Sequence, residues 1–350
     1  MTRTIVSVIG TRPQYVKAAV VTRALRSDGR FSEITIDTGQ HYDPEMSTLL
    51  LDDLPDVQRA RNLDIHGDDE HAVMARMTAA IGEVLTDQKP DAVLVYGDTN
   101  STVAGARAAA EQGIAIGHVE AGLRSYNTAM REERNRVEVD GISTLLFCPT
   151  HASVENLAKE GITNGVHHVG DVMYDAALTA REQVADMSTT RLPAEIHEPG
   201  SALATVHRAE TTDDPARLEK VLAYLHDVAE TIPGVLVFPV HPRTRAAIDA
   251  AGLSTSNLHV TEPLGYLEIT YLLMHVDTVY TDSGGLQKEA YFHRVPCVTL
   301  RDETEWVETI DAGWNRLWTV SEYAPRREIT EYGDGHAGRA IADVLGDRVG

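Results

Sequence analysis

The sequence predicts an α/β protein made of two Rossmann-like, doubly wound domains that face a cleft. Short β-branched, apolar runs alternate with helical segments, as expected of parallel sheets covered by helices on both faces. This alternation restarts after residues 182–200, a stretch that contains Pro193, Pro199 and Gly200 and shows no clear periodicity. A chain of 350 residues with 43% hydrophobic residues also exceeds what one core usually supports.

The predicted elements follow in order along the chain. In the first half the expected strands are residues 4–9, 33–37, 91–97, 114–119, 144–148 and 166–170, and the expected helices include 15–26, 71–86 and 101–112. In the second half the expected strands are residues 202–207, 234–240, 258–262, 277–282 and 296–300. We therefore expect an N-terminal domain over 1–180, a C-terminal domain over 181–330, and a helix within 331–350 that packs back on the N-terminal domain.

The charge and composition restrict the partners and the compartment. Thirty-one basic and 53 acidic residues give a net charge of −22, which argues against binding to nucleic acid or an anionic membrane. No apolar run approaches the length of a membrane span or secretory signal, so a cytoplasmic protein is expected. The 26 Arg against 5 Lys, with the acidic excess, indicate a halophilic protein, because at molar salt the Debye length is about 3 Å. Cys148 and Cys297 lie in apolar runs and are expected to be packed, reduced thiols.

Polar segments follow most of the expected strands, where doubly wound sheets bind their ligands. In TDSGGLQKEA, Ser283, Gly284 and Gly285 stand between a strand and a helix, so backbone N–H groups there can bind an anion; a tight chain reversal is the structural alternative. Arg12 and Lys17 bring cations to the end of the first strand. The chain has neither GxGxxG nor GxxxxGK[ST], so any phosphate is expected to belong to a substrate.

Acidic residues and histidines at other strand ends predict proton-transfer chemistry. Asp98 and Glu120 each follow an apolar strand, and Glu132 stands beside Glu133 in REERNR. A partly desolvated carboxylate at a strand end can act as general acid or base, although a helix cap or surface ion pair explains any one of them as well. Four histidines also lie at strand ends or in the following loops: His41, His118, His207 and His241. Their spacing matches no metal signature, and no GxSxG nucleophile motif is present, so we expect no metal and no cofactor.

The polar segments together resemble the motif series of the non-hydrolysing UDP-N-acetylglucosamine 2-epimerases. In chain order they are GTRPQYVK, TGQHYD, VYGDTNST, HVEAGLR, EERNR, GDVMYD, VHRAE, VHPRTR, TDSGGLQKEA and RDETEWVE. The resemblance extends from about residue 5 to residue 335. TRPQ, TNST, QKEA and TEWVE are more similar to the branch that epimerises UDP-2,3-diacetamido-2,3-dideoxyglucuronate.

The resemblance implies a glycosyltransferase-B-like, homodimeric enzyme that binds a UDP-sugar and needs no metal or nicotinamide. Its reaction would be the anti elimination of UDP across C1 and C2 to a 2-acetamidoglucal, followed by re-addition with the opposite configuration at C2. By motif, Asp98, Glu120 and Glu132 resemble the family's acids and bases, and Arg136 would support that group. Which acid serves which face of the sugar stays open.

The resemblance also assigns the nucleotide contacts. His207 resembles the family histidine near the diphosphate, and Glu289 the residue that accepts from the ribose hydroxyls. The resemblance implies that the segment Ser283, Gly284 and Gly285 binds phosphate oxygens, with Arg12 and Lys17 completing a basic island. Bacterial members bind a second UDP-sugar as an activator, and the residues that resemble that site are Gln40, His41, Arg208 and His241.

Some positions depart from the common family pattern. Gln14 stands where many members have glutamate, and Arg131 replaces the proline usually seen before the paired glutamates. Trp306 replaces an arginine that assists phosphate binding, and Arg301 either substitutes for it or is an ordinary helix-end charge. Lys288 is expected to be an exposed helical lysine, with a contact to the sugar carboxylate of a uronate as the other interpretation.

Other functions use the same features differently. A glycosyltransferase with the same donor would need an acceptor surface. A catalytically silent nucleotide-sugar sensor would bind through the same glycines and basic residues, but the intact Asp98, Glu120 and Glu132 argue against it. A hydrolytic epimerase would release free N-acetylmannosamine.

Overall fold

The protein consists of two compact units, each built on a parallel sheet. The computed structural model describes residues 2–40, 54, 56–57, 59–67, 69–187 and 191–349. One unit comprises residues 1–176 and 330–350, and the other comprises residues 177–329. The predicted α/β class with two parallel sheets is confirmed.

The first unit has a seven-stranded sheet in the order β3-β2-β1-β4-β5-β6-β7. Its strands are β1 (Arg3–Ile9), β2 (Phe31–Asp37), β3 (Arg59–Asn62), β4 (Ala92–Tyr96), β5 (Ala115–Val119), β6 (Leu145–Cys148) and β7 (Val166–His168). Its helices are α1 (Arg12–Asp28), α3 (Glu70–Gln88), α4 (Asn100–Glu111), α5 (Arg131–Ile142), α6 (His151–Lys159) and α14 (Ala337–Arg348), and α7 (Val172–Val184) begins in this unit. The strand order reverses between β1 and β4, which is the point where doubly wound sheets bind ligands.

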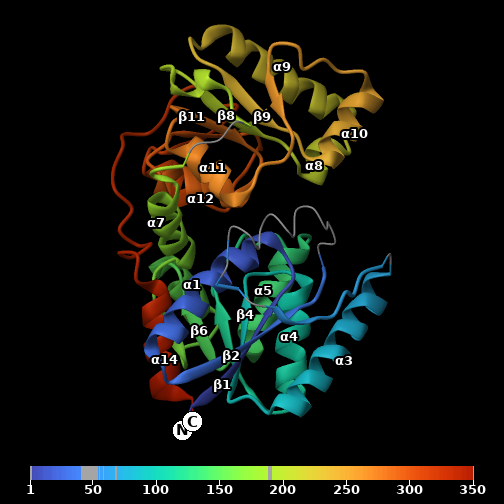
Figure 1. The fold of residues 1–350 in the computed structure, drawn as a ribbon, viewed down its shortest axis with the longest axis vertical. Coiled ribbons are helices and arrows are strands. Elements are labelled where there is room, and N and C mark those ends of the chain that lie inside the picture. The colour runs from blue at the N-terminus through green and yellow to red at the C-terminus, as the bar shows by residue number, and fades with distance from the viewer. Residues whose placement is uncertain are drawn as a thin grey trace. The chain divides into compact units, whose positions relative to one another are not determined.

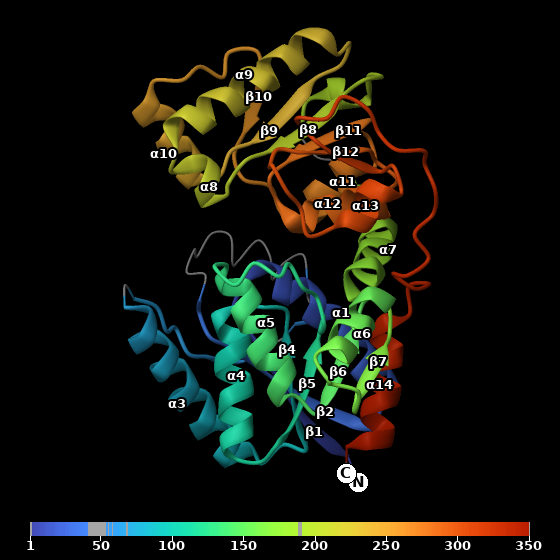
Figure 2. The same cartoon turned by 180° about the vertical axis from the view of Figure 1, so that it is seen from behind.

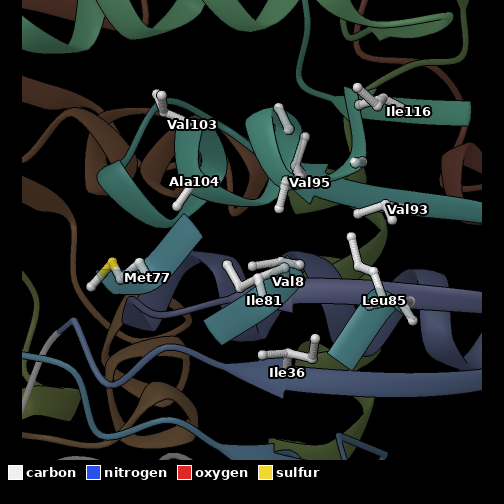
Figure 3. Packing of buried hydrophobic residues seen from close by; sticks show 14 of the residues in the cluster. Val8, Ile36, Met77, Ile81, Leu85, Val93, Val95, Val103, Ala104 and Ile116 are labelled. Carbon is white, nitrogen blue, oxygen red and sulfur yellow. The ribbon is translucent and has the colours of Figure 1, made fainter. Parts of the chain in front are cut away.

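Helices α3 and α4 cover one face of the first sheet. Met77, Ile81 and Leu85 recur every four residues along α3 and are fully buried, because this spacing puts them on one side of the helix. Figure 3 shows these side chains packed against β1, β2 and β4. A Cβ on Gly105 of α4 would lie 3.0 Å from the side chain of Val95, so glycine lets that helix approach the sheet closely.

The C-terminal helix α14 packs on α1 within the first unit. Figures 1 and 2 show the two helices side by side in both views. A Cβ on Gly338 would come within 2.7 Å of the Val20 side chain, which indicates how close the two helix backbones are. The guanidinium of Arg3 also donates to the backbone carbonyl of Gly346. These contacts attach the end of the chain to its first strand and first helix.

The second unit has a six-stranded sheet in the order β10-β9-β8-β11-β12-β13. Its strands are β8 (Ala202–Thr205), β9 (Leu236–Pro239), β10 (His259–Thr261), β11 (Thr278–Thr281), β12 (Cys297–Thr299) and β13 (Asn315–Leu317). Its helices are η1 (Ala194–His197), α8 (Ala209–Thr212), α9 (Pro215–Thr231), α10 (Pro242–Ala251), α11 (Tyr266–Leu273), α12 (Gly284–Phe292) and α13 (Val307–Asp311). Separate apolar cores lie on the two sheet faces: Ala202 and Ala204 belong to one, and Leu203 between them belongs to the other.

Each strand expected from the sequence is present, within a few residues of its expected ends. Pro13 lies in the first turn of α1, where its fixed φ suits the helix. Two strands were not expected, β3 and β13, and residues 182–200, interpreted as a linker, contain the end of α7 and the short helix η1. Among the described residues, no helix combines the length and apolar character needed to cross a bilayer.

Cys148 and Cys297 are free and buried, which confirms the prediction of packed thiols. Burial raises the pKa of the Cys148 thiol to about 12 and raises that of Cys297 further. The thiolate is the reactive form, so we expect neither cysteine to react with a thiol reagent in the native protein at pH 8, and both to react after denaturation. Counting titratable thiols before and after adding guanidinium chloride tests this, and prompt labelling of the native protein would contradict it.

Candidate active site

Two of the predicted acids follow adjacent strands at the same sheet edge. The pairing of β4 with β5 joins Tyr96 to Val119, the last residue of each strand. Asp98 and Glu120 therefore emerge together at the carboxyl edge. Gly97 has a left-handed φ of +63°, and a Cβ there would lie 3.4 Å from the Glu120 carboxylate, so glycine permits the turn and the approach.

Glu120 is held in a strained conformation beside a cation. Its φ is +72°, a region that a residue with a side chain rarely adopts. Its backbone N–H donates to the Phe147 carbonyl at 3.1 Å, and its carboxylate forms an ion pair with Lys17. The side chains of Glu120 and Lys17 are only 10% and 9% exposed. The structure thus brings together two residues that the sequence analysis assigned to different roles.

Helix α5 supports Asp98 from the side. A guanidinium nitrogen of Arg136 lies 2.5 Å from the Asp98 carboxylate, and the Asn135 side chain donates to the Asp98 carbonyl at 2.8 Å. The Asp98 side chain is still 28% exposed, so a ligand can reach it. The EERNR segment therefore orients both the backbone and the side chain of Asp98.

The two adjacent glutamates of α5 have different environments. Glu133 is buried and accepts hydrogen bonds from the backbone N–H groups of Ser125 and Tyr126 at 2.8 and 2.9 Å. Burial alone would raise the pKa of Glu133, but these bonds and the nearby Arg136 outweigh it and hold the pKa below its usual value. Glu132 is exposed on the first turn of the helix. Glu133 anchors the preceding loop, and Glu132 is the glutamate that a ligand can contact.

His118, one of the strand-end histidines, is a buried support rather than a ligand-facing group. Its Nδ1 lies 2.7 Å from the Asp140 carboxylate and its Nε2 lies 2.7 Å from the Gly97 carbonyl. Each ring nitrogen therefore faces an oxygen of the protein, one of a carboxylate and one of a backbone carbonyl. The same Asp140 accepts from the Gly122 N–H and from Arg124, so the network ties the turn before Asp98 to the loop after Glu120.

Gln14 explains one departure from the family pattern. Its side-chain oxygen accepts from the backbone N–H groups of Gly10 and Thr11, and its amide nitrogen donates to the Tyr96 carbonyl at 2.7 Å. A carboxylate could accept the first two bonds but could not donate the third. The amide therefore connects the β1–α1 turn to the β4–α4 turn. Arg12, at the start of α1, is half-buried beside these turns.

The second unit presents a helix N-terminus at the end of β11. The Ser283 side chain caps α12 by accepting from the Leu286 N–H, and Gly284 and Gly285 form the first helical turn. A Cβ on Gly284 would lie 2.4 Å from the Glu305 carboxylate, so the glycine lets this carboxylate lie against the helix. The Glu305 carboxylate accepts from Arg301 at 2.8 Å, and Arg208 lies 3.9 Å away. The carboxylate of Glu305 thus lies beside the first turn of α12, where Arg301 and Arg208 balance its charge.

Arg301 and Lys288 are both buried, at 4% and 2% exposure. Arg301 lies against Glu305, so the interpretation as an ordinary helix-end charge does not describe it. The expectation that Lys288 is an exposed helical lysine was wrong: its ammonium lies 4.0 Å above the centre of the Trp306 ring. Trp306 offers an aromatic face that attracts the ammonium, which explains how a lysine is accommodated in the interior.

The remaining predicted residues lie at several strand and helix ends. His207 follows β8 and its side chain is 45% exposed, and Glu289 is half-buried on α12. Of the residues that resemble the activator site, Gln40 binds Ser101 in the first unit, and Arg208 and His241 belong to the second. His41 lies outside the described residues. Their role in activation stays a prediction.

Three residues that the sequence analysis did not single out contribute strongly to these arrangements: Asp140, Asp282 and Glu305. Asp282 follows β11 directly within TDSGG, and its position before Ser283 was the available signal. Glu305 stands directly before Trp306 within RDETEWVE, which was an equivalent signal, and Asp140 carried none. Within the part of the chain that the structure describes, no cluster of His, Cys, Asp and Glu suits a metal ion.

These features define a class of protein: an α/β enzyme of glycosyltransferase-B-like fold, with carboxylates at the edge of one sheet and a glycine-containing helix N-terminus at the edge of the other. The family model described as UDP-N-acetylglucosamine 2-epimerase matches residues 23–346. The chain belongs to the UDP-N-acetylglucosamine 2-epimerase family, whose members are nucleotide-sugar 2-epimerases and therefore isomerases. The resemblance seen in the sequence is confirmed.

Individual relatives cover nearly the whole chain. A UDP-N-acetylglucosamine 2-epimerase homolog from Methanococcus maripaludis is 44% identical, over 97% of this chain and 99% of the relative. The UDP-2,3-diacetamido-2,3-dideoxy-D-glucuronate 2-epimerase of Pseudomonas aeruginosa is also 44% identical, over 97% of this chain and 94% of the relative. The crystal structure of Methanocaldococcus jannaschii UDP-GlcNAc 2-epimerase in complex with UDP-GlcNAc and UDP is similar with a TM-score of 0.87 and 34% identity, covering 99% of this chain and 100% of that one.

Proposed function

We propose that this protein interconverts UDP-N-acetylglucosamine and UDP-N-acetylmannosamine without hydrolysis. The observation that carries the proposal is the pair of acids, Asp98 and Glu120, at adjacent strand ends, each beside a cation. The exposed Glu132 on the neighbouring helix supplies a third carboxylate. Family membership and a similar protein whose structure holds UDP-GlcNAc and UDP support the substrate.

In the proposed reaction a carboxylate removes the C2 proton, and the electrons of the C2–H bond form the C1=C2 double bond. The C1–O bond breaks with its electron pair going to the diphosphate, so UDP leaves and a 2-acetamidoglucal remains. Re-addition reverses these steps, with a proton delivered to C2 from the other face. Asp98, Glu120 and Glu132 are the proposed acids and bases, because each is an accessible or half-buried carboxylate of the first unit.

Stabilising the departing diphosphate is the main electrostatic requirement, since its negative charge increases as the C1–O bond breaks. We assign this role to the N-terminus of α12 at Ser283, Gly284 and Gly285, with Arg301 nearby. His207 would donate to the diphosphate, and Glu289 would accept from the ribose hydroxyls. Arg12, Lys17 and Arg136 are the proposed cations of the first unit.

A second candidate substrate is UDP-2,3-diacetamido-2,3-dideoxyglucuronate. The Pseudomonas aeruginosa epimerase named for that sugar is as similar to this chain, at 44% identity, as the Methanococcus maripaludis homolog. The buried ammonium of Lys288 also places a positive charge on α12. Such a charge would attract the carboxylate of a uronate sugar more than it would a neutral sugar.

Proton exchange at C2 tests the proposal directly. We expect UDP-N-acetylglucosamine incubated with the protein in D2O at high salt to gain deuterium at C2 and to yield a manno product by NMR. Exchange only with the diacetamido uronate would select the second substrate. Release of free N-acetylmannosamine would indicate a hydrolytic epimerase, and sugar transfer without C2 inversion a glycosyltransferase. Binding without exchange of either sugar would contradict an epimerase.

We also propose that the protein is a salt-adapted, cytoplasmic homodimer. The net charge of −22, with Arg preferred over Lys, supports a high-salt environment, because concentrated salt screens the self-repulsion of an acidic surface. Light scattering at molar and at low salt would give the mass of the assembly and its dependence on screening.

A further inference from the structure

Asp282 binds His207 through both its backbone and its side chain. The Asp282 carboxylate is fully buried and accepts hydrogen bonds from the backbone N–H groups of His207 and Arg208, each at about 3.0 Å. The Nδ1 of the His207 ring lies 3.3 Å from the same carboxylate. One carboxylate therefore holds the start of the loop after β8 and also faces the imidazole that the loop carries.

The sheet explains why these two residues meet. Strands β8 and β11 are parallel neighbours in which Thr205 pairs with Thr281, so the residues that follow leave the sheet at the same edge. The two threonine hydroxyls are 2.6 Å apart, and the Asp282 N–H donates to the Thr205 carbonyl at 3.3 Å. Asp282 is thus held at the end of β11 with its side chain fully buried, whereas the His207 side chain is 45% exposed.

We propose that Asp282 is a positioning residue that fixes the orientation and tautomer of His207. A carboxylate only accepts, so the ring nitrogen that faces it carries the hydrogen, and the exposed Nε2 is the nitrogen that meets a ligand. Asp282 has no exposed surface and cannot touch a substrate itself. This inference rests on the proposed function. In the protonated ring Nδ1–H faces Asp282 and Nε2–H points to the leaving diphosphate oxygen; as the C1–O bond breaks, Nε2 gives its proton to that oxygen and the neutral ring keeps its hydrogen on Nδ1.

The tautomer can be measured without any substrate. In protein labelled with ¹⁵N-histidine, at a pH where the ring is neutral, we expect the His207 resonances to show the hydrogen on Nδ1. In the Asp282→Asn variant we expect a different tautomer or a mixture. A hydrogen on Nε2 in the unmodified protein would overturn the inference, whether or not the variant folds. This readout also keeps the inference separate from the proposed reaction, which fails if no nucleotide sugar exchanges at C2.

Kinetics test whether Asp282 acts through His207. We expect Asp282→Asn to lower kcat by about 10²-fold, with KM changed by less than about threefold. In a His207→Gln background the same substitution should have little further effect, since coupled residues are not additive. An equal loss of kcat in that background would show a merely structural role and overturn the inference. Asp277→Asn is the matched control. Asp277 lies next to the other end of β11 and also accepts a hydrogen bond from a backbone N–H group, that of Gly200 at 2.6 Å. The Asp277→Asn substitution should leave kcat unchanged.

Discussion

Replacing Asp98 by asparagine is expected to lower kcat by about 10²- to 10⁴-fold, the usual contribution of a general acid or base. Asparagine has the same shape and keeps the backbone bond from Asn135 to residue 98, so the fold should be preserved. The asparagine amide cannot accept the proton from C2 of the sugar or return one to it. We expect KM for the UDP-sugar to change far less than kcat, because the proposed contacts to the ribose and the diphosphate at His207, Glu289 and the N-terminus of α12 belong to the other unit.

The rate of deuterium incorporation at C2 measures this loss at the step concerned. Glu111→Gln is a suitable control, because Glu111 is exposed at the end of α4 and its replacement should leave the rate unchanged. Wild-type incorporation by the Asp98→Asn variant would remove Asp98 from the mechanism. The same measurement on Glu120→Gln and Glu132→Gln, started from the gluco and from the manno sugar in turn, would assign each acid to a face of C2.

The sequence could place Asp98 and Glu120 because each follows a short apolar run, and parallel neighbours bring such positions to one edge. The local pattern could not distinguish Glu132 from Glu133, because adjacent acids on a helix look alike; the choice of Glu132 came from the family resemblance. Only the structure of the preceding loop shows that Glu133 is buried and accepts hydrogen bonds from the N–H groups of Ser125 and Tyr126. Local sequence thus predicts which residue types reach the site, and tertiary contacts decide which of them face a ligand.

The missed strands have a similar explanation. β3 has the sequence RARN and β13 the sequence NRL, and both are edge strands of their sheets. An edge strand needs less apolar surface than a central one, so the run of β-branched residues that marks a strand is absent. The prediction for Lys288 was wrong for a different reason. A helical lysine is usually solvated, but the ring that attracts this one belongs to Trp306, at the start of the next helix, α13.

Replacing Asp140 by asparagine is expected to lower the free energy of unfolding by about 3–5 kcal/mol, the usual cost of removing one partner from a buried ion pair. Asp140 is 1% exposed and lies 2.7 Å from His118 and 2.7 Å from Arg124, so its replacement removes the buried counter-charge of Arg124, which keeps only its pair with Glu160, and the carboxylate that His118 faces. Urea titrations at high salt would measure the change. Glu138→Gln, which breaks the exposed pair between Glu138 and Arg107, is the control and should cost about 1 kcal/mol or less.

The dependence of this stability on pH provides a second measurement on Asp140. Burial by itself would raise the pKa of Asp140, but the hydrogen bond and charge of His118, together with Arg124, outweigh it and hold the pKa below the ordinary 3.8. The ionised form therefore stabilises the fold at pH values above 3.8, and this contribution is lost as the pH falls through the lower pKa of the folded state. Asparagine does not titrate, so the difference in unfolding free energy between the unmodified protein and Asp140→Asn should shrink as the pH falls below 3.8. A difference that stays constant across that range would show that Asp140 acts through packing rather than charge.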